Sequence, residues 1–301
     1  MESCRCGLIG SGIGASLSPA LHEAEGRHHG LDLSYVLFDV DRPGTPSGVA
    51  RLLDDAESAR FAGLNITHPF KQRVIDLLDE LSPQADDIGA VNTVVFRDGK
   101  RHGYNTDAYG FAESFRYVLP GAPVDHVVQL GAGGAGAACA YAQLTADIGR
   151  LTVVDPDAGR RAALRSSFAG RFGDRLAVAA PDRLPTLLAT ATGLVNASPI
   201  GMPAHPDTPL PAELLHPGLW LVDIIYSPIE TALLKAARDR GLRAVNGTAM
   251  CVFQAAAAFE LITGRVPDTG RMLRHLDLLL APAPLPRPGG NREPRDENSP
   301  P

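Results

Sequence analysis

Val127-Val-Gln-Leu-Gly131-Ala-Gly-Gly-Ala-Gly136 is the stretch that decides the fold, because a short apolar run leads directly into a glycine-rich turn. An alanine-rich segment follows, and the next apolar run ends in an acid, Asp155, 19 residues beyond Gly136. This spacing is close to the ~20 residues expected before the carboxylate that binds the adenine-side ribose of a dinucleotide. Glycines permit a tight turn and close backbone approach, and the following helix offers its N–H groups to a pyrophosphate. The stretch therefore predicts a dinucleotide-binding strand, turn and helix.

A second segment, Gly10-Ser-Gly-Ile-Gly-Ala15, matches the same loose glycine pattern. We expect no matching acid at the end of the strand that comes after it, and the segment runs into Ser16-Leu-Ser18-Pro19. Ser18 and Pro19 favour a helix start, because a serine N-cap satisfies a free backbone N–H and proline at the first helical position has none to satisfy. We interpret this segment as a turn that packs a strand against a helix.

Short runs rich in Val, Ile and Leu alternate with helical stretches from end to end, a pattern typical of βα units that wind parallel sheets. The predicted fold class is α/β with two domains. Residues 1–118, completed by helices within 248–280, form one domain, and residues 119–247 form a Rossmann-type nucleotide domain. The segment 119–123, Leu-Pro-Gly-Ala-Pro, is the expected hinge, and residues 281–301, dominated by Pro, Gly and charges, are expected to be disordered.

The expected elements follow from the same patterns. In the first third we expect strands near 5–10, 34–40 and 63–67, helices near 19–29, 48–59 and 70–80, and a hairpin of 91–96 with 101–104 around Asp98-Gly99. Beyond it we expect strands near 124–130, 151–155, 175–180, 193–197, 220–225 and 243–246, and closing helices near 248–263 and 268–280. The first closing helix should pack back against the N-terminal domain.

The composition excludes several classes of protein. With 301 residues, 45% hydrophobic and 21% charged, the chain has a globular composition. A net charge of −6 with interleaved acids and bases gives no basic stripe for nucleic acid. The first six residues lack the apolar region of a signal peptide, and no apolar run approaches the ~18 residues of a membrane span. We therefore expect a cytoplasmic protein with no nucleic-acid or membrane partner.

Cysteines occur at positions 4, 6, 139 and 251, and neither they nor the nine histidines fall in a metal-ligand spacing. We expect no metal and no disulfide. Cys4 and Cys6 alternate along an expected strand, and Cys139 and Cys251 sit among alanines of expected helices. All four are interpreted as buried small hydrophobes.

Seven segments, in chain order, closely resemble those of the shikimate dehydrogenases. They are Ser16-Leu-Ser18-Pro19, Asn65-Ile-Thr67-His-Pro69-Phe-Lys71, Gly89-Ala-Val-Asn92-Thr93, Asn105-Thr-Asp107, the turn at Gly131, Asn196-Ala-Ser198 and Gln254-Ala-Ala. The resemblance covers about residues 5 to 280. His22-Glu-Ala-Glu-Gly26 and residues 65–72 are more similar to quinate/shikimate dehydrogenases of the actinobacterial type. The resemblance implies two α/β domains with a cleft between them, the N-terminal one binding substrate.

The resemblance also implies roles for individual residues. Lys71 would be the catalytic acid or base, with Asp107 beside it, and Ser16 and Ser18 would bind a substrate carboxylate. The full set of implied substrate contacts is Ser16, Ser18, Thr67, Asn92, Asp107, Tyr226 and Gln254. The implied cofactor contacts are Gly131, Ala132, Gly133, Gly134, Ala135, Gly136, Asp155, Asn196, Ser198, Gly247 and Met250. The implied reaction is reversible oxidation of shikimate or quinate, small polyhydroxy carboxylates, to the 3-dehydro ketone by hydride transfer to NAD(P).

The residue types suit this chemistry independently of the resemblance. Interconversion of an alcohol and a ketone needs a group that exchanges a proton with the reacting oxygen, and a buried lysine suits it because desolvation favours the neutral amine. Asp107 would favour the charged amine, so the protonation state stays open. Each residue also has a simpler interpretation: Lys71 as a solvated helix-start residue and Asp107 as an acid that complements a helix dipole. Gln254 lies in an otherwise apolar helix, where a long polar side chain needs a partner.

Two departures from the family pattern bear on cofactor and substrate. NADP-using relatives usually carry Asn-Arg-Thr where this chain has Asp155-Pro-Asp157, which favours NAD, although Arg160 and Arg161 are close behind. Ser18 stands where some quinate-preferring relatives have threonine, which makes shikimate the first choice. The alternatives are a biosynthetic NADP-dependent 3-dehydroshikimate reductase, an aminoshikimate-type dehydrogenase and a non-catalytic metabolite-sensing module. The sequence leaves open whether the chain is a monomer or a homodimer.

Overall fold

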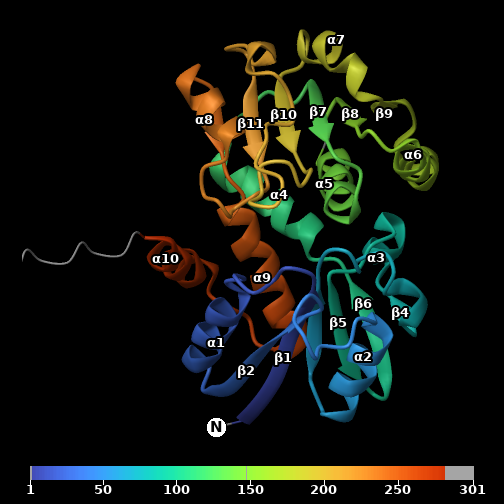
Figure 1. Cartoon of the computed structure of the whole chain (residues 1–301), viewed down its shortest axis with the longest axis vertical. Helices are drawn as coiled ribbons and strands as arrows, with labels where there is room; N and C mark the ends of the chain where they lie inside the picture. The colour runs from blue at the N-terminus through green and yellow to red at the C-terminus, as the bar shows by residue number, and fades with distance from the viewer. Residues whose placement is uncertain (1, 147, 282–301) are drawn as a thin grey trace, which may run out of the picture.

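The fold is taken from a computed structural model that describes residues 2–146 and 148–281. From residue 282 onward, the segment expected to be disordered lies outside the described residues. Figure 1 shows two α/β halves, one built on β1 to β6 and the other on β7 to β12, with α4 and α9 between them. The predicted two-domain α/β fold class is confirmed.

The first sheet consists of β1 (Glu2–Gly10), β2 (Leu31–Asp39), β3 (Gly63–Ile66), β4 (Glu80–Leu81), β5 (Thr93–Arg97) and β6 (Lys100–Tyr104). Its order is β2-β1-β3-β5-β6-β4, with β1, β2 and β3 parallel and β5 antiparallel to both β3 and β6. The predicted hairpin is confirmed, because Asp98 (φ 54°) and Gly99 (φ 71°) form a two-residue turn with positive φ. The parallel strands end at one edge, where the segments that carry Ser16 and Thr67 begin.

The second sheet consists of β7 (His126–Leu130), β8 (Arg150–Val154), β9 (Leu176–Ala179), β10 (Gly193–Asn196), β11 (Trp220–Asp223) and β12 (Arg243–Val245). All strands are parallel in the order β12-β11-β10-β7-β8-β9, the doubly wound order of a Rossmann sheet. The strand order reverses between β7 and β10, and ligands of such sheets bind beside that point. The glycine-rich turn comes directly after β7 there.

Ten α-helices are described. They are α1 (Ser18–His28), α2 (Val49–Ser58), α3 (Pro83–Ile88), α4 (Asp107–Val118), α5 (Gly134–Thr145), α6 (Ala158–Phe172), α7 (Leu184–Leu188), α8 (Ala232–Asp239), α9 (Thr248–Thr263) and α10 (Thr269–Leu280). Helix α9 packs on α4 and also contacts α1, β3 and β5 of the first half. The two helices approach closely at Gly110, where a Cβ would lie 2.8 Å from the Cβ of Gln254. Within residues 2–146 and 148–281, no helix has the length and apolar character needed to cross a membrane.

A buried ionic cluster joins α10 to α1. Glu25 is 1% exposed and accepts hydrogen bonds from Arg271 Nε (2.9 Å) and Nη2 (2.6 Å). The backbone N–H of Asp268 (2.9 Å) and the ring of His29 (3.1 Å) complete its partners. The last helix is therefore held to the first by charge as well as by apolar packing.

The expected helix over 70–80 is wrong. The segment forms a turn with a short 3-10 helix, η1 (Ile75–Leu77), and then strand β4, which pairs with β6. Phe70 and Val74 are buried in one apolar cluster, and Ile75, Leu77 and Leu78 pack against it. Positions 70, 74, 77 and 78 would share one face of a helix, so the local pattern allows one, but packing in this cluster and the pairing of β4 with β6 decide the conformation.

Two helix starts also differ from expectation. Helix α1 begins at Ser18 with Leu17 as its N-cap and no side-chain cap, while Ser16 Oγ accepts the Ser18 N–H at 3.3 Å. Ser18 is therefore not the expected N-cap. Helix α3 was not expected, although Ser82 caps it by accepting the N–H of Ala85 and Gly89 ends it with φ 67°. The Ser82-Pro83 start and the glycine stop were available signals.

Candidate active site

Lys71 and Asp107 form a buried pair at the edge between the two halves. Lys71 lies in the turn after β3, and Asp107 is the first residue of α4, where a carboxylate complements the helix dipole. Nζ lies 2.5 Å from Oδ2, and the side chains are only 15% and 8% exposed. Lys71 is thus neither helical nor solvated, and that simpler interpretation is wrong.

Asn92 holds the other oxygen of the Asp107 carboxylate. Its Nδ2 donates to Asp107 Oδ1 (2.9 Å) and to Thr106 Oγ1 (2.8 Å), while its Oδ1 accepts the backbone N–H of Thr106 (2.7 Å). Asn105 adds a bond from Nδ2 to the carbonyl of Ala90 (2.8 Å). The start of α4 is therefore pinned to the chain just before β5, which fixes the orientation of Asp107.

Ser16, Ser18 and Tyr226 form a second group of polar side chains. The two serine hydroxyls lie 3.2 Å apart, and Tyr226, from the loop after β11, lies near Ser16. The neighbouring Cys251 and burial raise the pKa of the Tyr226 hydroxyl against the opposing effect of Ser16, so it stays a neutral donor. Three hydroxyls from two halves of the chain therefore converge, an arrangement suited to a carboxylate.

Gln254 lies on α9, which packs on α4, the helix that begins with Asp107. Thr67 lies in the same turn after β3 as Lys71. Gln254 Nε2 donates to the carbonyl of Cys251 at 2.9 Å, so α9 itself supplies a partner. Thr67 comes directly after β3, and its Cγ2 would lie 2.3 Å from a Cβ at Gly10.

The glycine-rich turn has the backbone conformation and close packing that a dinucleotide site needs. Gly131 has φ 98°, and a Cβ there would lie 2.6 Å from the carbonyl oxygen of Ala197. A Cβ at Gly136 would lie 2.3 Å from the carbonyl oxygen of Gly131, so this glycine lets helix pack on strand. A Cβ at Gly133 would meet nothing within 4 Å, which leaves an open face before the N-terminus of α5. A Cβ at Gly134 would lie 3.2 Å from Lys71 Cβ, so the turn abuts the Lys71–Asp107 pair.

Asp155 ties the end of β8 to this turn. It is 3% exposed, and its two oxygens accept the N–H groups of Ala132 and Asp157, each at 2.8 Å. Arg161 donates to the carbonyls of Asp155 (2.5 Å) and Pro156 (3.0 Å), and Arg160 Nε lies 3.9 Å from the Asp157 carboxylate. Both arginines thus have partners at the end of β8, and Arg161 is not simply solvated.

The remaining predicted cofactor residues lie at the end of β10, on the loop after it and at the start of α9. Asn196 is fully buried, and its Oδ1 accepts from Ser198 Oγ at 2.7 Å, so it shapes the loop after β10. A Cβ at Gly247 would lie 1.9 Å from the carbonyl oxygen of Ile224, a position that only glycine fits. Met250 is 8% exposed in the first turn of α9. The side chains of Asn196 and Met250 are buried, and Gly247 has none.

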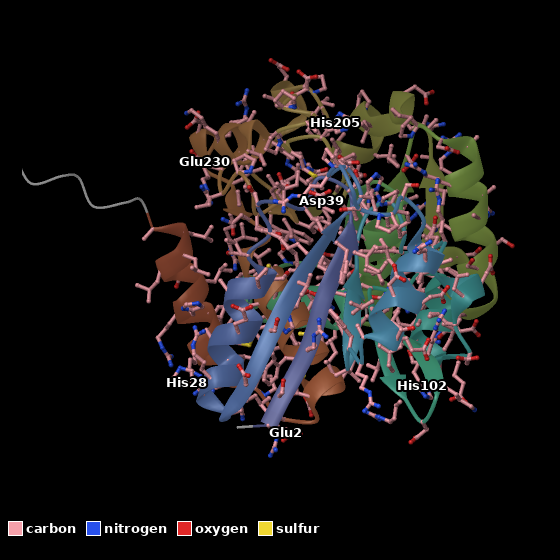
Figure 2. All side chains as sticks on the ribbon, turned by 60° about the horizontal axis from the view of Figure 1, so that its bottom comes forward. Glu2, His28, Asp39, His102, His205 and Glu230 are labelled. Atoms are coloured by element: carbon pink, nitrogen blue, oxygen red, sulfur yellow. The ribbon has the colours of Figure 1, made fainter. Side chains whose placement is uncertain are left out.

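The first glycine segment differs from the second in its packing and in the distance to the next helix. Figure 2 shows Asp39 and Glu2 at opposite ends of the strands β1 and β2. Asp39, the last residue of β2, accepts the N–H of Gly12 through Oδ1 at 3.0 Å. The expectation that no acid ends this strand is therefore wrong. A Cβ at Gly10 would nevertheless lie 2.3 Å from Thr67, and α1 starts only at Ser18. The turn has no helix N-terminus directly behind it, which favours a packing role.

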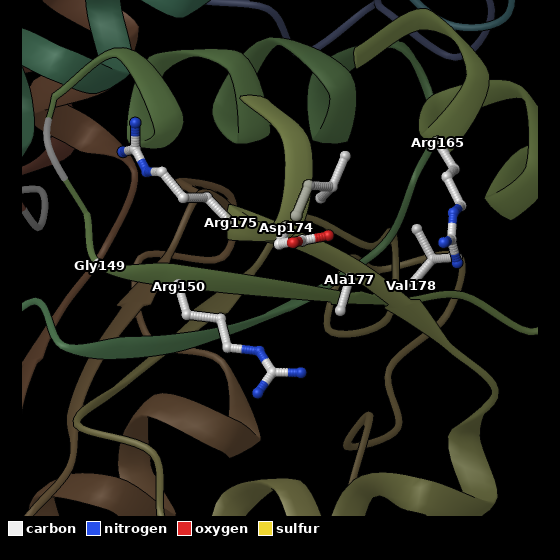
Figure 3. A pocket seen from close by; sticks show the side chains of 8 residues that line it. Gly149, Arg150, Arg165, Asp174, Arg175, Ala177 and Val178 are labelled. Carbon is white, nitrogen blue, oxygen red and sulfur yellow. The ribbon is translucent and has the colours of Figure 1, made fainter. Parts of the chain in front are cut away.

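The hollow in Figure 3 lies at the outer edge of the second sheet, beside β8 and β9. It is lined by Arg150, Arg165 and Arg175. Arg175 Nη2 donates to the carbonyls of Leu144 (2.8 Å) and Ile148 (2.7 Å), so it anchors the end of α5. Its lining includes none of the predicted site residues.

Known proteins place the chain in a family. A model of the shikimate dehydrogenase substrate binding domain matches residues 8–94. The chain is 57% identical over 274 residues to the Streptomyces avermitilis protein named shikimate dehydrogenase (NADP(+)), covering 90% of this chain and 94% of that one. The chain belongs to the shikimate dehydrogenase family. The resemblance seen in the motifs is confirmed.

Relatives within the family differ in cofactor. A Corynebacterium glutamicum (strain R) protein named quinate/shikimate dehydrogenase (NAD(+)) is 45% identical, with 90% of this chain and 97% of that one covered. The structure of quinate dehydrogenase from Corynebacterium glutamicum in complex with NAD superposes with a TM-score of 0.85 at 44% identity, covering 91% and 99% of the two chains. The family thus includes enzymes named for NAD and for NADP.

Several residues of the site were missed from the sequence. Asn65, Thr93 and Thr106 hydrogen-bond within the network around Asn92. Gln129 Nε2 donates to the carbonyls of Gly131 (2.9 Å) and Gly136 (2.8 Å) and so clamps both ends of the glycine turn. A glutamine inside an otherwise apolar strand was a signal for such a clamp.

Asp223, also missed, gives a pH-dependent prediction. Burial raises its pKa from 3.8 to about 6, against hydrogen bonds from Thr231, the Ile225 N–H and Asn196. A raised carboxyl pKa stabilises the fold fully below the unfolded pKa, and this contribution is lost as pH rises through about 6. Relative to Asp223→Asn, the wild type should lose ~1–2 kcal/mol of unfolding free energy between pH 5 and 7.

Urea unfolding at several pH values measures this difference. Asp239→Asn, an exposed acid paired with Lys235, is the matched control and should show a nearly constant difference from wild type. An Asp223→Asn difference that does not vary between pH 5 and 7 would contradict the prediction.

Proposed function

We propose that this chain catalyses the reversible oxidation of a ring hydroxyl of shikimate to the ketone, coupled to a nicotinamide dinucleotide. The observation that carries the proposal is the buried Lys71–Asp107 pair, 2.5 Å apart, set directly against Gly134 of the nucleotide turn. A proton-exchanging group and a dinucleotide turn at one place are what alcohol oxidation by hydride transfer requires. In this proposal residues 1–118, with the helices of 248–280, hold substrate, and residues 119–247 hold the cofactor.

The proposed substrate contacts form two groups, one for the carboxylate of the substrate and one for its ring hydroxyls. Ser16, Ser18 and Tyr226 receive the carboxylate. Thr67, Asn92, Asp107 and Gln254 bind ring hydroxyls. A site built to hydrogen-bond hydroxyls rejects analogues that lack them, because its buried polar groups are then left unpaired.

Lys71 exchanges the proton in this reaction. In oxidation its neutral amine accepts the hydroxyl proton while the carbon gives up hydride, and in the reverse direction the charged amine returns the proton to the ketone oxygen. A nicotinamide dinucleotide at the glycine turn supplies the hydride acceptor or donor. Asp107 Oδ2 holds Nζ, and Asn92 holds Oδ1, so the amine is oriented before substrate arrives.

The residues present fit such a cofactor. The open face at Gly133 and the N–H groups at the start of α5 suit a pyrophosphate. Gly247 and Met250 border the nicotinamide end. We propose NAD as the preferred cofactor, because Asp155 directly follows β8 and Asp157 lies two residues further on. A 2′-phosphate would bring negative charge against both carboxylates.

Initial rates with shikimate or quinate and with NAD or NADP test both proposals. Wild type should oxidise shikimate faster than quinate and prefer NAD by at least about tenfold in kcat/KM, since ~1.4 kcal/mol corresponds to tenfold. Asp155→Asn should shrink that preference by weakening NAD and relieving repulsion of NADP. Asp157→Asn is the matched neighbour and should change the ratio less. A wild type that prefers NADP, or an Asp155→Asn ratio equal to wild type, would contradict the cofactor assignment.

A biosynthetic NADP-dependent 3-dehydroshikimate reductase is the second candidate. It is favoured by the NADP(+) name of the 57% identical relative and by Arg160 in the first turn of α6. Initial rates with aminoshikimate and each cofactor, measured alongside those with shikimate and quinate, test the aminoshikimate-type dehydrogenase. Absence of activity with every pair would instead support a metabolite-sensing module. A cytoplasmic monomer or homodimer belongs to the same proposal, and light scattering distinguishes these two states.

A further inference from the structure

We propose that Thr93 is a positioning residue for the Lys71–Asp107 pair, acting through a buried hydrogen-bonded chain that begins at Tyr35 beside the carboxylate-binding serines. Thr93 touches neither substrate nor cofactor in this proposal. Its hydroxyl fixes the amide of Asn92, which in turn fixes the Asp107 carboxylate. The inference rests on the proposed function, because it assigns how that function's proton-exchanging pair is held.

The chain is continuous from Tyr35 to Asn92. The Tyr35 hydroxyl donates to Asn65 Oδ1 at 2.8 Å, and Asn65 Nδ2 donates to Thr93 Oγ1 at 3.1 Å. The Thr93 hydroxyl lies 3.0 Å from Asn92 Oδ1. Ser18 also lies near the Tyr35 hydroxyl. One chain therefore leads from a tyrosine beside Ser18 to the residue that holds Asp107.

A backbone N–H sets the direction of every bond in this chain. Thr106 N–H can only donate, and it lies 2.7 Å from Asn92 Oδ1, so this oxygen is the acceptor. The Thr93 hydroxyl must then donate to Asn92 Oδ1 and accept from Asn65 Nδ2. Asn92 Nδ2 is consequently turned to Asp107 Oδ1 at 2.9 Å, leaving Oδ2 for Lys71.

Burial makes the loss of one link consequential. Thr93 is 0% exposed, Asn92 3%, Tyr35 6% and Asn65 7%. When a buried donor loses its hydrogen-bond partner, water does not readily replace that partner. The neighbouring side chains then rotate to form other hydrogen bonds, or the donor stays unpaired. Without the Thr93 hydroxyl, Asn65 Nδ2 keeps only a 3.4 Å contact to the Asn92 carbonyl. Asn92 and Asp107 then lose part of their fixed orientation.

The test is Thr93→Val, which removes the hydroxyl at nearly constant volume. We expect kcat for shikimate oxidation to fall about tenfold, the size expected from one buried hydrogen bond. KM for shikimate should stay within about threefold, because the carboxylate contacts are unchanged. Thr93→Ser should restore kcat to within about threefold of wild type, since it restores the hydroxyl.

Thr152→Val is the matched control. Thr152 is also buried, at 1% exposed, and its hydroxyl contacts His126 at 3.1 Å in the second sheet. It should leave kcat within twofold. Equal loss of kcat in Thr93→Val and Thr152→Val, an unchanged kcat in a folded Thr93→Val, or failure of Thr93→Ser to restore kcat would overturn the proposal.

A measurement that needs no catalysis tests the positioning role of Thr93 independently of the proposed function. Acylation of Lys71 by acetic anhydride, followed by mass spectrometry at one pH, reports how tightly Asp107 holds the amine. The reaction should be at least about threefold faster in Thr93→Val and unchanged in Thr152→Val. Equal rates overturn the positioning role even if wild type lacks shikimate oxidation. Should Thr93→Val not fold, Tyr35→Phe should lower kcat about threefold with KM unchanged, and a wild-type kcat there overturns the proposal.

Discussion

Replacing Lys71 by alanine is expected to lower kcat by about 10² to 10⁴, the usual range for loss of a general acid or base. The reason is that Nζ, held 2.5 Å from the Asp107 carboxylate, is the group placed to exchange the proton. Binding of NAD should change much less, because the Lys71 atoms nearest to Gly134 of the glycine turn belong to its aliphatic stem. Steady-state rates with calorimetric NAD binding measure both effects.

Lys100→Ala is the control for this substitution. Lys100 is also paired with an acid, Glu80, but both side chains are about half exposed and lie on the first sheet's β4 and β6. Its loss should leave kcat within twofold. A Lys71→Ala enzyme that retains activity within a factor of two of the parent would remove Lys71 from the mechanism.

Replacing Arg271 by methionine is expected to cost about 3 kcal/mol of unfolding free energy. The substitution leaves the Glu25 carboxylate, 1% exposed, without its bidentate partner between α1 and α10. Arg51→Met, which breaks an exposed pair with Asp55, should cost less than about 0.5 kcal/mol. Urea denaturation at pH 7.5 compares the two, and equal small losses would show that the cluster is not stabilising.

The Arg271 effect should depend on pH in a defined direction. Burial alone would raise the pKa of Glu25, but hydrogen bonds from Arg271 and the Asp268 N–H, and the Arg271 charge, lower it below its ordinary 4.5. A lowered carboxyl pKa stabilises the fold above the unfolded pKa, and this contribution is lost as pH falls through the folded value. The gap between wild type and Arg271→Met should therefore narrow below about pH 4.5. A gap that stays constant or widens there would contradict this assignment.

The nucleotide half could be predicted from the sequence because its signals are local. Strand, glycine turn, helix and the acid at Asp155 depend on backbone conformation and on neighbours within about 25 residues. The Asp98-Gly99 hairpin is local in the same sense. The expected helix over 70–80 failed because packing of Val74 and Ile75 and pairing of β4 with β6 overrode local propensity.

The sequence by itself determined the α/β class and the strand, glycine turn and helix around Gly131, and through the resemblance it predicted which residues form the site. Only the tertiary structure decided how these residues act on one another. Lys71 and Asp107 are 36 positions apart in sequence, and Ser16 and Tyr226 come from different halves. Distances of this kind depend on how sheets and helices pack, which no local pattern encodes. Thr93 shows this most clearly, because a threonine that begins a strand is ordinary until its neighbours in space are known.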